Sequence, residues 1–140
     1  MHARQAGLTL VELMVVVAVM AIIATIAYPM YTAQVQKSRR ADAKVALQAI
    51  ALAQERHFTI NGEYTASLST LQVSPTIQGG TSDEGYYTLN LTRSGTDNEQ
   101  FSVTATPAAG AAQASDGGCA SFTINQMGAK TATGTATNCW

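Results

Sequence analysis

A long apolar run near the N-terminus constrains this chain more than any other feature. Residues 8–27 are apolar at nearly every position. As a helix rising 1.5 Å per residue they would be about 30 Å long, which is enough to cross a bilayer. One carboxylate, Glu12, lies inside the run, and no cation accompanies it there. Because a charge in hydrocarbon costs at least about 2.5–3.5 kcal/mol, we expect Glu12 to have a partner from outside the run.

The partner of Glu12 depends on how the N-terminus is processed. Arg4 supplies a cation only while the N-terminal segment stays attached. Cleavage after Gly7 would instead create an α-amine at Leu8, and the amine of a neighbouring copy could approach Glu12. Two other outcomes stay open, an ordinary secretory signal cut after Ala27 and an uncleaved single-pass anchor. The sequence of the mature N-terminus distinguishes the three.

The N-terminal segment resembles the N-terminal signal of type IV pilins. The resemblance lies in residues 7–13, Gly-Leu-Thr-Leu-Val-Glu-Leu, and in the apolar run that follows them. In that family a prepilin peptidase cuts after the glycine and methylates the new amine, and the apolar helix stays in the mature protein. The resemblance implies a cleavage site between Gly7 and Leu8 and N-methylation of Leu8. It also implies that Leu8 and Glu12 serve in subunit docking. Most members have Phe where this chain has Leu8.

The same resemblance implies a fold, partners and a location. Pilins have a long N-terminal helix, a four-stranded antiparallel sheet on its C-terminal half, and a disulfide that delimits a C-terminal region, here Cys119 to Cys139. The implied partners are other pilin subunits, major and minor, in a helical filament, the inner membrane, the prepilin peptidase and the pilus assembly platform. Before assembly the subunit would cross the bacterial inner membrane once, with its head in the periplasm, and after assembly it would lie in a surface pilus. Ala21 stands where abundant major pilins often carry a glycine, which favours a minor pilin.

The apolar run is expected to continue as a helix outside the membrane. Pro29 lacks an N–H and would crowd the carbonyl of Thr25, which predicts a helix kink there. Residues 31–57 contain no Gly or Pro and are rich in good helix formers, with apolar residues at three- and four-residue spacings. We therefore predict a helix to about residue 57, with Gly62 as its stop. The predicted core stripe consists of Val35, Ala46, Ala49, Ile50, Ala53 and His57.

The second half of the chain predicts a small sheet. Four segments alternate between apolar and polar residues or carry β-branched residues, which is typical of strands. They are residues 86–91, 101–104, 120–125 and 130–135. Leu68, Leu71 and Val73 are expected to pack beneath a loop, and residues 107–118 are predicted to be a surface connection with little to bury. The fold class is therefore α+β, a long N-terminal transmembrane and amphipathic helix with a four-stranded antiparallel sheet packed on its C-terminal half.

The expected organisation has four consecutive parts. They are a leader peptide, a transmembrane and assembly helix, an amphipathic helix half packed on the head, and a globular β-sheet head that includes a C-terminal disulfide region. Their ranges are 1–7, 8–30, 31–60 and 61–140, with the disulfide region at 119–139. The two cysteines of the chain, Cys119 and Cys139, fit an oxidising compartment. We favour a disulfide between them, which would stabilise the fold by about 3 kcal/mol, over a thiol pair for redox or metal chemistry.

Few residues are candidates for catalysis or for binding a metal or cofactor. We therefore expect that the protein is not an enzyme and that it has no catalytic residues, no cofactor and no metal site. His57 is interpreted as a packing or capping residue. Asp97 and Glu99 could bind calcium weakly, and this alternative stays open. We favour the simpler interpretation that these residues belong to a turn, where such polar residues are common. From residue 61 onward the sequence has two cations, Arg93 and Lys130, and six acidic residues. Because this region carries a net negative charge, no nucleic-acid partner is expected.

The favoured function is that of a type IV pilus structural subunit, a minor pilin that helps to initiate fibre assembly and supports twitching motility and cell adhesion. The alternatives are a type II secretion pseudopilin and, ranked lower, a DNA-uptake pilin that binds DNA.

Overall fold

The computed structural model describes residues 9–140, so Gly7 and Leu8 lie outside the described residues. The chain divides into two compact units between Val35 and Gln36. One helix, α1 (Leu10–Asn61), has residues in both units. The other elements all belong to the second unit, which we call the head. They are η1 (Leu68–Thr70), α2 (Pro75–Gln78), β1 (Tyr87–Ser94), β2 (Gln100–Pro107), η2 (Ala112–Ser115), β3 (Ser121–Asn125) and β4 (Lys130–Thr133).

Both ends of α1 are capped by short polar or flexible residues. At the start, the Thr9 hydroxyl accepts a hydrogen bond from the Glu12 N–H at 3.2 Å, which satisfies one of the free N–H groups of the first turn. At the end, Gly62 has a φ of 77°, and its N–H donates to the Phe58 carbonyl at 2.8 Å. Glycine adopts this left-handed conformation without strain, so Gly62 ends α1 as predicted.

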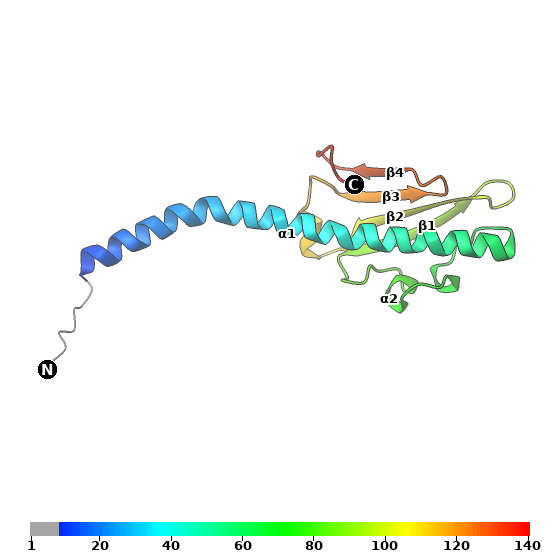
Figure 1. Cartoon of the computed structure of the whole chain (residues 1–140), viewed down its shortest axis with the longest axis horizontal. Helices are drawn as coiled ribbons and strands as arrows, with labels where there is room; N and C mark the ends of the chain where they lie inside the picture. Colours follow the sequence, from blue (N-terminus) through cyan, green and yellow to red (C-terminus); the bar gives the residue numbers. More distant parts are fainter. Residues whose placement is uncertain (1–8) are drawn as a thin grey trace. The chain divides into compact units, whose positions relative to one another are not determined.

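The four strands form one antiparallel sheet in the order β1-β2-β3-β4 (Figure 1). The predicted strands are all present, and their bounds shift by up to three residues. Val103 lies opposite Leu91 on one side and opposite Ile124 on the other. The turn between β1 and β2 contains Gly95 and Asn98, both with positive φ, which agrees with the turn chemistry expected at Asp97 and Glu99. The α+β prediction is therefore confirmed.

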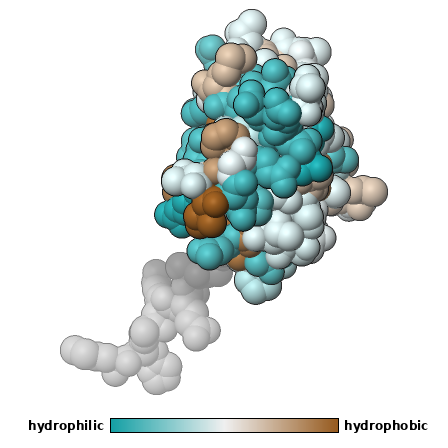
Figure 2. Space-filling view, turned by 90° about the vertical axis from the view of Figure 1, so that its right-hand side faces the viewer, coloured by the Kyte–Doolittle hydropathy of each residue, from teal (hydrophilic) through white to brown (hydrophobic). Residues whose placement is uncertain are grey.

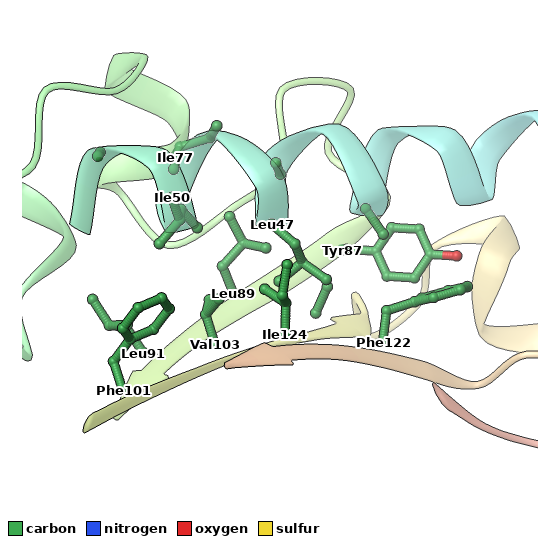
Figure 3. Close-up of a cluster of buried hydrophobic side chains, with 14 of the residues drawn as sticks. Leu47, Ile50, Ile77, Tyr87, Leu89, Leu91, Phe101, Val103, Phe122 and Ile124 are labelled. Carbon is green, nitrogen blue, oxygen red and sulfur yellow. The ribbon is translucent and has the colours of Figure 1, made fainter. Parts of the chain in front are cut away.

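The hydrophobic core lies between α1 and one face of the sheet. Leu47 and Ile50 point from α1 toward the strands, and Val103 and Phe122 point back toward the helix (Figure 3). All four side chains are fully buried. Because alternate strand residues point to opposite faces, burial on β1 to β3 follows the period of two that the sequence predicted.

The buried stripe of α1 differs in part from the predicted one. Ala46, Ile50 and Ala53 are buried as expected, whereas Val35, Ala49 and His57 are only half-buried. Ala43, Leu47 and Gln54 are buried instead. The buried positions follow steps of three and four, and the helix face that they form is centred on Ile50, so Ala49 lies at its margin. Gln54 is buried because its side-chain amide pairs with the backbone of Thr65, donating at 2.7 Å and accepting at 3.1 Å.

The segment after β2 corrects another expectation. Residues 107–118 were predicted to bury little, yet Gln113 and Asp116 in this segment are buried. Beneath the loop after α1, Leu71 is buried and Leu68 and Val73 pack at the margin of the core, as predicted. Ile77 of α2 is also buried and was not foreseen. The end of the head where α1 finishes is mainly hydrophilic, with hydrophobic residues in small separate areas (Figure 2).

Candidate functional site

The described part of the first unit, residues 9–35, carries a single charged side chain on an apolar helix. Among the described residues, α1 alone is long and apolar enough to cross a membrane, judged by length and composition. Between residues 9 and 35, Glu12 is the only charged residue, and its neighbours on the helix, such as Leu13 and Val16, are exposed. Within residues 9–140 the Glu12 carboxylate forms no salt bridge. It lies in the first turn of α1, where the helix dipole favours a negative charge.

Pro29 lies inside α1, and the helix is assigned on both sides of it. Two threonines nearby donate hydrogen bonds to backbone carbonyls three residues earlier, Thr25 to Ile22 at 2.7 Å and Thr32 to Pro29 at 2.9 Å. The carbonyl that Pro29 leaves without its helical N–H partner is that of Thr25, and neither of these bonds reaches it. A kink at Pro29 stays a prediction.

In the head, a buried ion pair ties α1 to the segment before the disulfide. The Arg40 guanidinium donates from Nε and Nη2 to the two oxygens of Asp116 at 2.6 and 2.8 Å. The same carboxylate accepts from Gln113 Nε2 at 2.7 Å and from the N–H groups of Gly118 and Cys119 at 3.2 and 3.3 Å. Burial by itself would raise the pKa of Asp116, but the Arg40 hydrogen bond and charge, with the two backbone N–H groups, lower that pKa below its usual value.

Cys119 and Cys139 form the predicted disulfide, which joins the residues just before β3 to the end of the chain. Next to it, the Trp140 ring packs edge-to-face on Phe122 with the ring centroids 5.7 Å apart. The Trp140 indole N–H donates to the Thr131 carbonyl on β4 at 2.7 Å. The disulfide and Trp140 together hold the C-terminal residues against the sheet.

A cationic cluster lies beside this C-terminal region, and we define it as Lys37, Arg40, Lys44 and Lys130. The Lys44 ammonium lies 5.8 Å from the Phe122 ring centroid, and Lys130 lies 5.0 Å from that of Trp140. Burial, followed by the charges of Arg40, Lys37 and Lys130, lowers the pKa of Lys44. Among the described residues only Arg40 of the cluster has a salt-bridge partner. An unpaired group of lysines attracts anions.

The cluster changes how the charge of the head is counted. Sequence reasoning counted charges from residue 61 onward and obtained an acidic domain. The head of the structure begins at Gln36, so the cations of α1 belong to the same unit as Lys130. It then carries seven Lys and Arg against eight Asp and Glu, a net charge of 7 − 8 = −1. The signal for this grouping was the amphipathic pattern of α1, which already predicted that the helix packs on the sheet.

The other candidate residues gather no recognisable chemistry. His57 lies near Asn61, whose Nδ2 is 3.2 Å from His57 Nδ1, and it lines a hollow of about 410 Å³ with Ile60 and Leu71. In the part of the chain that is described, no three His, Cys, Asp or Glu side chains are placed to hold a metal ion. Asp97 and Glu99 flank the turn residue Asn98, whose side chain donates to Glu63 at 2.9 Å.

Sequence reasoning missed Asp116 and Gln113, two buried polar residues of the head that hydrogen-bond to each other. The available signal was an acid and an amide within an otherwise Ala- and Gly-rich segment directly before Cys119. A lone acid or amide in such a segment is a candidate for a buried hydrogen bond or ion pair with a residue elsewhere in the chain, because a buried charge needs a partner.

Comparison with known proteins agrees with this architecture. Residues 29–123 match the family described as "Type IV minor pilin ComP, DNA uptake sequence receptor", and residues 2–28 match the prokaryotic N-terminal methylation motif. The type IV major pilin protein PilA of Myxococcus xanthus (strain DK1622) is 35% identical over 74 residues, 53% of this chain. The chain spans about a third of that relative, with 34% of its length covered.

A crystal structure of the Neisseria meningitidis non-core minor pilin PilV has the same fold. It superimposes with a TM-score of 0.52 over 76% of this chain and 94% of PilV, at 21% identity. This family and this fold are those of structural proteins. Because the first match covers more than half of the sequence, the chain belongs to the family of type IV minor pilins that includes ComP.

Proposed function

We propose that this protein is a type IV pilus subunit that docks by pairing Glu12 with the α-amine of Leu8 in a neighbouring subunit. The observation that carries the proposal is that Glu12 is the sole charge of an exposed apolar helix segment. Joining a filament moves this helix from lipid into a bundle of similar helices, so little hydrophobic free energy is gained. An ion pair in a medium of low dielectric constant is an interaction that lipid does not supply, and an unpaired charge there is costly.

The proposal requires the N-terminal processing that the methylation motif indicates. Cleavage by the prepilin peptidase between Gly7 and Leu8 would remove the leader, and methylation of Leu8 would keep its amine cationic. The apolar helix, with the methylation motif, indicates membrane anchoring and a place in the pilus. We further propose residues 8–30 as the single membrane span, residues 31–60 as the helix half on the head, and a periplasmic head that the assembly platform moves into the fibre.

Variants of Glu12 test the docking proposal. Glu12→Ala and Glu12→Gln should reduce co-purification of partner pilins from detergent-solubilised membranes at least tenfold, while membrane insertion of the variant is unchanged. Met14→Ala is the matched control, because it alters an exposed apolar residue of the same helix turn without changing charge. Equal recovery of partners with Glu12→Gln and with the unaltered chain would contradict the proposal.

We also propose that the protein acts as a minor pilin that helps to initiate the fibre, and thereby supports twitching motility and adhesion. Deletion followed by counting surface fibres tests this role. Loss of fibres, although the protein is scarce along them, agrees with a priming subunit. Intact fibres with lost protein secretion would instead assign the protein to a type II secretion system.

A DNA-uptake role is the second candidate function, and two observations favour it. The family description names a DNA uptake sequence receptor. In addition, Lys37, Lys44 and Lys130 of the cationic cluster have no salt-bridge partner among residues 9–140, and the Trp140 ring lies 5.0 Å from the Lys130 ammonium. We propose that these three lysines contact DNA phosphates, as unpaired cations on DNA-binding proteins do.

Salt dependence tests this second function. Three phosphate contacts on duplex DNA predict that log K falls with log salt concentration with a slope of about −3. Lys44→Gln with Lys130→Gln should reduce that slope by about two, whereas Arg93→Gln, which removes a cation on β1, should leave it unchanged. DNA affinity that is absent at low salt, or that is equal in all three proteins, would remove the candidate.

A further inference from the structure

The sheet face turned away from α1 has an unusual composition. Alternate strand residues point to opposite faces, so the residues that alternate with the buried ones along each strand form this outer face. Every residue on it is a Ser, Thr, Asn or Gln. They are Thr88, Asn90, Thr92 and Ser94 on β1, Gln100, Ser102, Thr104 and Thr106 on β2, Ser121, Thr123 and Asn125 on β3, and Thr131 and Thr133 on β4. None of these side chains is buried. We call this surface the hydroxyl face.

The register of the sheet arranges the hydroxyl face in rows that cross the strands. One row crosses all four strands and another crosses three. The first contains Asn90, Thr104, Thr123 and Thr131, and the second contains Thr92, Ser102 and Asn125. Neighbours within a row are about 4.8 Å apart in the strand-to-strand direction, and rows repeat about every 6.8 Å along a strand. Thr104 and Thr123 share a hydrogen bond between their hydroxyls at 3.0 Å.

Strand propensity accounts for only part of this composition. Threonine favours strands, but asparagine is depleted in them, and this face carries Asn90 in the middle of β1. Asn125 at the end of β3 has a local role, because its Oδ1 accepts hydrogen bonds from the N–H groups of Met127 and Ala129 in the turn that follows. Exposed faces of antiparallel sheets also gain from pairs of opposite charge across strands. Here no such pair exists on the described strands, although the chain has charged residues elsewhere on its surface. The surface is therefore neutral and rich in groups that both donate and accept hydrogen bonds.

A groove continues the hydroxyl face at the edge of β1. It has a volume of about 360 Å³ and is bounded by the loop before η1, the end of α2 and β1. Its polar side chains are those of Ser67, Ser69, Gln78 and Asn90, and no charged residue lines it. Asn90 belongs to both the groove and the row that crosses the sheet. The groove is shallow and open to solvent.

We propose that the hydroxyl face and this groove bind an uncharged, extended polysaccharide. Such a polymer presents hydroxyl donors and acceptors at regular intervals along its length. Each row of the hydroxyl face presents matching groups at regular intervals from strand to strand. A charged partner would find no opposite charge on the face. An apolar partner would strip water from the hydroxyls without replacing their hydrogen bonds, which is unfavourable. The proposal does not depend on the docking of Glu12 or on binding of DNA.

Affinity electrophoresis of the full-length chain tests the proposal. The protein is kept in a detergent without a sugar headgroup, such as lauryldimethylamine oxide, and run through native gels that contain hydroxyethyl cellulose, dextran or the acidic polymer alginate. We expect retardation by at least one of the two neutral polymers and none by alginate. The double variant Thr104→Val, Thr123→Val removes both hydroxyls of a bonded pair and leaves neither partner unsatisfied. It should bind about tenfold more weakly, because two neutral hydrogen bonds are lost.

The control variant is Thr59→Val, which removes an exposed hydroxyl on α1 that donates to the Glu55 carbonyl. It should bind like the unaltered chain. The proposal is overturned if neither neutral polymer retards the protein, or if the double variant binds as tightly as Thr59→Val. It is also overturned if light scattering shows that the face pairs with a second copy and that the double variant abolishes this pairing without affecting the polysaccharide gels.

Discussion

Replacing either partner of the Arg40–Asp116 pair should destabilise the head far more than breaking its other ion pair. The Asp116 side chain is 2% exposed and that of Arg40 is 17% exposed, so the pair is shielded from water. Arg40→Met removes two charge-assisted hydrogen bonds, but the Gln113 amide and the N–H groups of Gly118 and Cys119 still serve the carboxylate. We therefore expect a loss of about 3 kcal/mol, at the low end for a broken buried pair.

Asp116→Asn should cost more, about 3–5 kcal/mol, because one side-chain oxygen becomes an amide that faces the donors of Arg40 and Gln113. The matched control is Glu63→Gln. Its partner Arg93 lies 3.4 Å away, and the two side chains are 46% and 34% exposed. An exposed pair of this kind contributes about 0–1 kcal/mol.

Urea unfolding of the full-length chain in detergent micelles measures these differences. Trp140 is the only tryptophan, and it packs on Phe122 in the head, so its fluorescence reports on unfolding of this region. Since the folded-state pKa of Asp116 is lowered, the pair's contribution is present above the unfolded-state pKa of about 3.9 and is lost as the pH falls through the folded-state pKa. Asp116→Asn should therefore flatten the acid limb of the stability curve. The reasoning is refuted if Arg40→Met and Glu63→Gln destabilise the head equally.

Three further predictions concern the stability of the head. Leu47→Ala should reduce the free energy of unfolding by about 2–5 kcal/mol, measured in urea, because the side chain is fully buried; a loss below that of an exposed Leu52→Ala control would contradict it. Reduction of the Cys119–Cys139 disulfide should lower the stability by about 3 kcal/mol for its separation of 20 residues, and unchanged urea midpoints in dithiothreitol would oppose this. Burial, with the hydrogen bond to Glu55, raises the pKa of Tyr64 to about 12. Stability should therefore fall as the pH rises from about 10, the unfolded-state pKa, to 12, and less so in Tyr64→Phe.

Much of the fold could be predicted because short-range rules decide it. The apolar run and the helix formers after it predicted α1, and Gly62 ends α1 because glycine tolerates a positive φ. Alternation predicted the strands, since each has one buried face. The pairing of Arg40 with Asp116, 76 residues apart, had no such signal. Long-range pairs between single polar residues depend on how the chain packs, and no local pattern encodes them.

The site was predictable to different degrees for the same reason. Glu12 stands out because its environment is fixed by the residues beside it in the sequence. The cationic cluster combines α1 with Lys130, and the hydroxyl face combines residues from four strands. Counting charge along the chain therefore separated cations that the fold brings together. The register that aligns Thr104 with Thr123 emerges only when the strands are paired.

The most direct test of the filament account is the N-terminus of the mature protein, determined by mass spectrometry on chains purified from cells and from sheared pili. The account predicts that both begin at Leu8 with a methylated amine, which places a cation at the membrane edge for the Glu12 of another subunit. A mature chain that begins at Met1 or at Tyr28 would contradict it, because the amine would be displaced from Glu12 or the helix carrying Glu12 would be absent.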